Sequence, residues 1–381
     1  KIQQSEGAIA MGRLAGRTAQ GIAAVAIGGA NVGVNGAGSN NQGLCAIAVG
    51  TGAGVDAQGE YSVAVGWAAG QTTQGEFSVA VGRGAGRNTQ GIGAVAIGAE
   101  TGGGVGPGHS NQGNYAIAIG ASAGATSQET NAIAIGSGAG ESLQSQGAVA
   151  IGLQAARSGQ ANFAVAVGRE AGRDEQQVYS VALGYQAGQF DQGTTGGGAT
   201  GQAVAIGFQA GNRDQQARAI AIGFEAGLLE QEQLSIAIGG EAGEIRQGLN
   251  SGGLEGAAVA IGSSAGRYQQ QFGSIAIGAF AAQTNQASVG ISLGAFTNFA
   301  DAPGQGAITM GYLTGSAGAT GEFSTAIGVN ITNIPDDVLV LGSKPSAAAF
   351  NMFGLASNAT YINNDVRPLT GGNAGKSLEY N

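Results

Sequence analysis

The chain has 381 residues, of which 75 are glycine and 5 are proline, and 10% are charged; a globular enzyme is about a quarter charged, so this composition argues against one. The scarcity of proline excludes a collagen-like triple helix, and a hydrophobic content of 43% excludes a disordered chain. The formal net charge of −9, with Lys and Arg scattered singly and no long apolar run, predicts neither nucleic-acid binding nor membrane insertion.

A short phrase, apolar residue–Ala–apolar residue–Gly, recurs along the chain, mostly every 16 residues. We call its last residue the anchor glycine and each repeat a coil. The anchors are Gly12, Gly28, Gly50, Gly66, Gly82, Gly98, Gly120, Gly136, Gly152, Gly168, Gly184, Gly207, Gly223, Gly239, Gly262, Gly278, Gly294, Gly311 and Gly328. Four longer intervals predict insertion loops, near residues 31–41, 102–111, 194–200 and 249–256.

The residues before each anchor predict a strand that is apolar on both faces. Val63 and Val65, for example, alternate with Ser62 and Ala64. Alternation places the branched residues on one face and the small residues on the other. Two apolar faces must both be buried, by stacking of coils and by lateral association of chains. We expect the Val/Ile face to fill each coil and the Ala/Ser face to meet neighbouring chains, although the reverse assignment would meet the same requirement.

A corner and a second short strand follow the anchor. The corner carries an Ala-Gly pair, such as Ala69–Gly70, whose glycine permits a positive φ. Eight residues after the anchor stands a glutamine, and stacked glutamines about 4.8 Å apart suit a ladder of amide hydrogen bonds, with ligand contact as the alternative. The glutamines are Gln20, Gln58, Gln74, Gln90, Gln128, Gln144, Gln160, Gln176, Gln192, Gln215, Gln231, Gln247, Gln270 and Gln286.

The phrases EYSVAVGWAAG and NAIAIGSGAG resemble the head repeats of YadA-type trimeric adhesins, over roughly residues 7–342. That family has a repeat nearer 14 residues and lacks the regular Ala-Gly and glutamine. GYQAGQFDQG and IGFQAGNRDQQARAIAIG look more like repeats in fibres of phages and large DNA viruses. The tail, VLVLGSKPS followed by NATYINNDVRPLTGGNAGKSLEYN, is similar to the segment that leads, in such fibres, to an endosialidase-type intramolecular chaperone, which these 381 residues do not include.

The resemblance implies an all-β fold, a left-handed parallel β-roll or solenoid of about nineteen 16-residue coils that forms a homotrimer. We expect residues 1–328 to form the β-roll and residues 329–381 a C-terminal cap or neck. The implied function is a virion fibre, displayed outside the cell for attachment to a host glycan or protein receptor, or serving as a shaft joined to other virion proteins. The alternatives are the head of a bacterial autotransporter adhesin and a glycan-degrading fibre with a site between subunits.

No catalytic, cofactor or metal site is predicted. His109 is the only histidine and Cys45 the only cysteine, so a catalytic triad, a zinc site and an intrachain disulfide lack the necessary residues. We expect Cys45 to be a small apolar space-filler. The first residue, Lys1, suggests a fragment or a processed chain.

The candidates for recognition are aromatic. Trp67, Tyr185, Phe208 and Phe224 directly follow anchors, and the last three, in consecutive coils, predict a stripe that either binds a ligand or packs on a neighbouring chain. His109 and the insertion loops are further candidates. Five rings at the start of the apolar strands are expected to pack: Tyr61, Phe77, Tyr115, Phe163 and Tyr179.

Overall fold

The computed structural model describes residues 4–30, 35–100, 105–194, 201–248, 256–299, 303–315, 320–332, 334, 336–343, 353–356, 361–362 and 378–379. Much of the predicted insertions (31–34, 102–104, 195–200 and 249–255) and most of the tail lie outside the described residues. The described chain is an all-β parallel solenoid of about nineteen coils, without a helix in those ranges. It divides into two compact units, Lys1–Asp191 (unit 1) and Gln192–Asn381 (unit 2).

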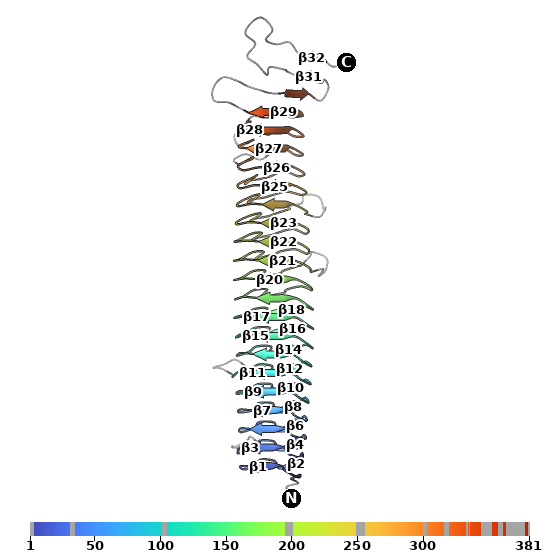
Figure 1. The fold of residues 1–381 in the computed structure, drawn as a ribbon, viewed down its shortest axis with the longest axis vertical. Coiled ribbons are helices and arrows are strands. Elements are labelled where there is room, and N and C mark those ends of the chain that lie inside the picture. Colours follow the sequence, from blue (N-terminus) through green and yellow to red (C-terminus); the bar gives the residue numbers. More distant parts are fainter. Residues whose placement is uncertain are drawn as a thin grey trace. The chain divides into compact units, whose positions relative to one another are not determined.

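In unit 1 every coil contributes one strand to a parallel sheet, which we call the apolar sheet. The strands of successive coils lie one above another (Figure 1). Equal positions face each other, as Val63 does Val79 and Ala64 does Ala80. Its strands are β1 (Ile9–Met11), β3 (Val25–Ile27), β5 (Ile47–Val49), β7 (Val63–Val65), β9 (Val79–Val81), β11 (Val95–Ile97), β13 (Ile117–Ile119), β15 (Ile133–Ile135), β17 (Val149–Ile151), β19 (Val165–Val167) and β20 (Val181–Leu183).

A second, nine-stranded parallel sheet forms the other side of unit 1, and each of its strands ends on a glutamine. We call it the glutamine sheet. Its strands are β2 (Thr18–Gln20), β4 (Asn40–Gln42), β6 (Asp56–Gln58), β8 (Thr72–Gln74), β10 (Asn88–Gln90), β12 (Ser110–Gln112), β14 (Thr126–Gln128), β16 (Ser142–Gln144) and β18 (Ser158–Gln160).

Unit 2 repeats the apolar sheet, and single parallel bridges, such as Arg213 to Leu229, join the other side of its coils. Parallel pairing continues through residue 343, after which β30 pairs antiparallel with β29, and β31 with β32. The strands are β21 (Val204–Ile206), β22 (Ile220–Ile222), β23 (Ile236–Ile238), β24 (Val259–Ile261), β25 (Ile275–Ile277), β26 (Ile291–Leu293), β27 (Ile308–Tyr312), β28 (Thr325–Val329), β29 (Val338–Ser343), β30 (Phe353–Ala356), β31 (Tyr361–Ile362) and β32 (Leu378–Glu379).

The anchor glycine sets the sharp bend between strand and corner. Gly66 has a φ of 131°, a region that side-chain-bearing residues rarely adopt. A Cβ added there would lie 2.5 Å from the carbonyl oxygen of Gly82 in the next coil. Glycine is therefore required both by the bend and by the close approach of successive coils.

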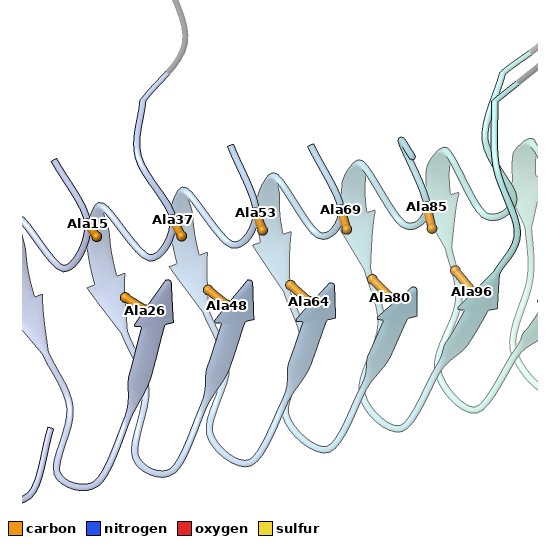
Figure 2. Packing of buried hydrophobic residues seen from close by; sticks show 10 residues of the cluster. All are labelled: Ala15, Ala26, Ala37, Ala48, Ala53, Ala64, Ala69, Ala80, Ala85 and Ala96. Carbon is orange, nitrogen blue, oxygen red and sulfur yellow. The ribbon is translucent and has the colours of Figure 1, made fainter. Parts of the chain in front are cut away.

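The core of unit 1 consists of alanine methyl groups, and this overturns the expected orientation of the apolar strands. Figure 2 shows alanines of the strands, such as Ala64, pointing toward alanines of the facing segment, such as Ala69, and all ten are buried. The Val/Ile face points outward instead: Ile47 is 37% exposed. The reason is thickness, because a Cβ added at Gly70 would lie only 3.3 Å from the Cβ of Ala64. A branched side chain does not fit between the two layers.

Among the described residues, no helix is long and apolar enough to cross a membrane.

Candidate functional site

The glutamines of the repeat turn inward and are buried in both units. In unit 1 the Nε2 of Gln112 donates to the Oε1 of Gln128 at 3.2 Å, and the chain of bonds continues through Gln144 and Gln160 to Gln176 at 3.0–3.1 Å. The same Nε2 atoms also donate to strand carbonyls, as Gln144 does to Ile133 at 2.8 Å. In unit 2 amide bonds of 2.9–3.2 Å join Gln192, Gln215, Gln231, Gln247, Gln270 and Gln286. These amides hold coils together and are not accessible to a ligand.

Two ladder members, Gln42 and Gln112, escaped the sequence analysis because an insertion separates each from its preceding anchor. Counting eight residues back from the following anchors, Gly50 and Gly120, finds both. In the first coils the amide-to-amide bonds are not made: within the described residues, the Oε1 atoms of Gln20, Gln42, Gln58, Gln74 and Gln90 have no hydrogen-bond partner. Their Nε2 atoms still donate to strand carbonyls, as Gln74 does to Val63 at 2.8 Å.

Trp67 is the centre of the first aromatic site, on the outside of unit 1. Its indole is 38% exposed. Two guanidinium groups of the next coil lie over the ring, with the Cζ of Arg83 at 5.2 Å and the Cζ of Arg87 at 5.6 Å from its centroid. The Nε of Arg87 donates to the Oε1 of Gln71 at 2.9 Å. The 16-residue period places Arg83 directly after Trp67 in the same column, but it did not reveal that Arg87 reaches the ring.

The charges around Trp67 are unevenly matched. Arg83 pairs with Glu100 at 3.6 Å, whereas no carboxylate of the described residues lies within ion-pair distance of Arg87. His109 lies in the coil after Arg87, since the carbonyl of His109 accepts the backbone N–H of Asn88 at 2.8 Å. Burial lowers the pKa of His109, the charge of Arg87 lowers it further, and Glu100 opposes both. The predicted residues Trp67 and His109 thus lie in the coils before and after Arg87.

Tyr185, also in unit 1, belongs to a closed ionic network. Arg169 lies over its ring with the Cζ at 5.6 Å. Both nearby arginines are paired: Arg169 with Glu170 at 3.2 Å, and Arg173 with Glu170 at 3.8 Å and with Asp174 at 3.3 Å. The hydrogen bond from Gln186 lowers the pKa of Glu170, burial opposes this, and Arg169 and Arg173 support it. The carboxylates therefore already occupy these guanidinium groups.

In unit 2, Phe208 and Phe224 stack on each other, with centroids 5.2 Å apart and planes 7° apart. Both rings remain exposed on their outer sides, at 42% and 51%. Tyr185, the third residue of the predicted stripe, belongs to unit 1.

The five rings expected to pack are exposed within a single chain, where two pairs of them contact each other. Cys45 is also exposed, so the expectation that it is a small apolar space-filler is wrong. Their column occupies the corner before each apolar strand, where the residue has a positive φ, 54° for Cys45 and 55° for Tyr61. Tyr61 stacks on Phe77, and Phe163 on Tyr179, with centroids 5.4 and 5.6 Å apart, so the rings contact one another along the column.

Two further groups of polar residues show no catalytic arrangement. In unit 2, Arg267 pairs with Glu241 at 2.9 Å and contacts Glu244, and burial together with Glu244 and Glu241 raises the pKa of the nearby Glu225. In unit 1, a shallow hollow of about 390 Å³ contains Glu129, whose Oε2 accepts the N–H of Gln146 at 3.0 Å. Among the described residues, no group of three or more His, Cys, Asp or Glu side chains could hold a metal ion.

Comparison with known proteins gives no assignment: no family model matches the sequence, and no curated protein is significantly similar to it. The arrangement itself supports two kinds of interaction. One is lateral packing through the outward Val/Ile face, and the other is recognition of a ligand at the guanidinium of Arg87 beside Trp67, which is in no ion pair with a described residue.

Proposed function

We propose that this chain is the repeat region of a homotrimeric virion fibre that mediates attachment to a host surface. The observation that carries the proposal is the outward face of the apolar sheet, which most coils line with two Val, Ile or Leu side chains. On β7 and β13 these are Val63 with Val65, and Ile117 with Ile119, all incompletely buried within one chain. Soluble monomers rarely leave a continuous apolar surface of this kind uncovered.

Each coil that a partner chain covers adds buried apolar surface on this face, and so adds to the free energy of association. The side chains of this face remain partly exposed, for example Ile97 at 38%, so completing their burial would contribute on the order of 1 kcal/mol per coil. The sum over the coils of each unit is on the order of 10 kcal/mol, which is comparable with the cost of bringing chains together, about 4–15 kcal/mol.

Further copies of the same chain are the occupants that fit this face. Its side chains repeat at the spacing of stacked parallel strands, about 4.8 Å. A partner that covers every row must repeat at that spacing, and an identical chain in register does so. The resemblance to trimeric adhesins favours three chains over two and a left-handed roll, and the resemblance to virus fibres favours the virion.

Sedimentation equilibrium on the 381-residue chain tests the assembly, and we expect a trimer. Val65→Lys places a charge on the apolar face and should cause dissociation. Thr73→Lys, an exposed change on β8 of the same coil, is the matched control and should leave the trimer intact. A folded monomer of the unmodified chain, shown by its β circular dichroism, would refute the assembly.

Competition tests the attachment role. The purified trimer should reduce adsorption of the virus to its host cells, and an antibody against the chain should label intact virions. Failure of both, with a trimer present, would exclude the virion-fibre function.

A further inference from the structure

We propose that Trp67, Arg83 and Arg87 form a binding site for an acidic saccharide, one that carries a carboxylate or sulfate group. The inference deepens the proposed function by naming a class of receptor, and its role in attachment rests on that function. The binding step itself depends only on residues of unit 1.

The guanidinium of Arg87 is held in place and has unused donors. The indole of Trp67 lies beneath it, with the Cζ 5.6 Å from the ring centroid, and the hydrogen bond to Gln71 fixes its Nε. Within the described residues, neither Nη atom has a hydrogen-bond acceptor or a carboxylate partner. A planar guanidinium held by one nitrogen presents its remaining N–H groups as a fork that matches the oxygens of a carboxylate or sulfate.

The electrostatic balance of the site favours an anion although the chain as a whole carries a net charge of −9. Among the described residues, Glu100 is the only carboxylate paired with either arginine, and it pairs with Arg83 at 3.6 Å. His109 adds no fixed positive charge at neutral pH, because its pKa is lowered from 6.5. The positive charge of Arg87 therefore remains available.

A second arginine in the equivalent position of its coil shows how a neighbouring carboxylate can occupy such a guanidinium. Arg157 stands five residues after its anchor, as Arg87 does, and its Nε donates to Glu141 at 2.9 Å. The residue one coil earlier accepts the hydrogen bond from Nε in both cases. It is the carboxylate Glu141 for Arg157 and the neutral amide Gln71 for Arg87, and both bonds are 2.9 Å long. Arg157 is neutralised by this partner and Arg87 is not.

A saccharide fits the surroundings better than a simple anion. The exposed part of Trp67 offers an apolar surface to the C–H groups of a sugar ring. Beside Arg87, the first residues of β8, β10 and β12 form a row of polar side chains. The hydrogen bonds along this row are long: Thr72 donates to Asn88 at 3.4 Å, and Asn88 donates to Ser110 at 3.4 Å. Bonds at this limit are readily exchanged for sugar hydroxyl groups. β8, β10 and β12 belong to the glutamine sheet, so an assembly through the apolar sheet leaves this row uncovered.

Tryptophan fluorescence tests the site directly, because Trp67 is the only tryptophan. The full chain is titrated with sialyllactose, a sulfated disaccharide, lactose and inorganic phosphate. We expect a saturable change with one or both acidic sugars and none with lactose. The two acidic sugars distinguish a carboxylate receptor from a sulfated one. A response to neither, or an equal response to phosphate and to the better sugar, would overturn the proposal.

Three variants make the test specific. Gln71→Glu keeps the hydrogen bond to Arg87 but neutralises it, and should weaken binding at least tenfold; Arg87→Gln should do the same. Arg157→Gln, the matched control, should bind like the unmodified chain. Equal affinity for all would refute the site.

Sedimentation of the same samples separates the two proposals. A monomer that still binds the acidic sugar would exclude the fibre but not the site, whereas a trimer that binds none would exclude only the site.

Discussion

Two regions of unit 2 build the same coil with different interiors. From Gly207 to Gln286, each coil places a small residue, usually glycine, four residues after the anchor and a glutamine four residues later. In the coil that begins at Gly294, the position of the small residue holds Asn298. The interval to the next anchor, Gly311, is one residue longer, and the glutamine position, eight residues before that anchor, holds Pro303. The backbone pairing of β26 with β27 nevertheless keeps the register of the preceding strands.

In this coil the buried amide is supplied by Asn298, at a different position from the glutamines, and it makes a different set of hydrogen bonds. Asn298 donates to the hydroxyl groups of Ser292 at 2.8 Å and Thr309 at 2.5 Å, and accepts from Thr320 at 3.0 Å. The carbonyl of Ile291, which a glutamine at position 303 would satisfy, accepts from Thr309 at 3.3 Å instead. The coil therefore requires one buried amide with bonded neighbours, and tolerates a change in the residue that supplies it.

The largest effect should come from removing an amide in the regular region. Gln231→Leu keeps the volume but leaves the carbonyl of Ile220 and the Oε1 of Gln247 without their donor. We expect a loss of about 3 kcal/mol in the free energy of unfolding, because buried polar atoms are left unpaired. Chemical denaturation followed by circular dichroism measures it. The control Gln305→Leu changes an exposed glutamine and should cost less than about 0.5 kcal/mol; equal losses would contradict a structural role for the ladder.

The exchange of positions can be tested by a double-mutant cycle. Asn298→Gly removes the network, and Pro303→Gln adds an amide to a space that Asn298 already fills. Each change should cost about 2 kcal/mol, and the double variant, which restores the regular pattern, should recover at least about 1 kcal/mol of their sum. Urea midpoints of the three variants measure this. Strict additivity would show that the two positions do not share one buried space.

The sequence predicted the stacking of coils because each anchor glycine marks a bend that few other residues can make. The sequence did not decide which face of the apolar strands points into the coil, since the alternating residues of β7 make both of its faces apolar. The distance between the two sheets decides that question, and composition does not express it directly. A usable signal was the near-constancy of alanine at positions such as Ala64 and Ala69, where the exceptions are mostly the small residues Ser and Thr, as at Ser292 and Thr309. Val63 and Val65, by contrast, are replaced in other coils by Ile, Leu or Met.

The candidate site was predicted only in part. Trp67 stands out as the single tryptophan, and His109 as the single histidine. The importance of Arg87 depends on its neighbours one coil away, Gln71 and His109, and on the absence of a carboxylate among the described residues near it. An insertion before His109 shifts the simple count of 16 residues. Alignment of coils by their following anchors, rather than their preceding ones, would have brought these residues together.

The smallest expected effects on stability come from two glutamates that occupy the same position of the coil in different surroundings. Glu170 and Glu225 both stand two residues after an anchor. Hydrogen bonds and arginines lower the pKa of Glu170, so its ionised form adds stability above the ordinary value of 4.5, and this stability is lost as the pH falls through the lowered pKa. Burial and two carboxylates raise the pKa of Glu225 above the ordinary value of 4.5. Its protonated form therefore adds stability below 4.5, and this stability is lost as the pH rises through the raised pKa.

Replacement of each carboxylate by glutamine should therefore have opposite results at neutral pH. Glu170→Gln should lower the free energy of unfolding by about 1 kcal/mol, since it removes charge-assisted hydrogen bonds. Glu225→Gln should raise the thermal midpoint slightly, because it removes an unfavourable charge. Both differences should shrink in acid, where the original carboxylates are protonated, and thermal melts across the acidic to neutral range measure this. If the two variants changed stability in the same direction, the neighbouring charges would not control this position, and the backbone of the corner alone would account for its tolerance of glutamate.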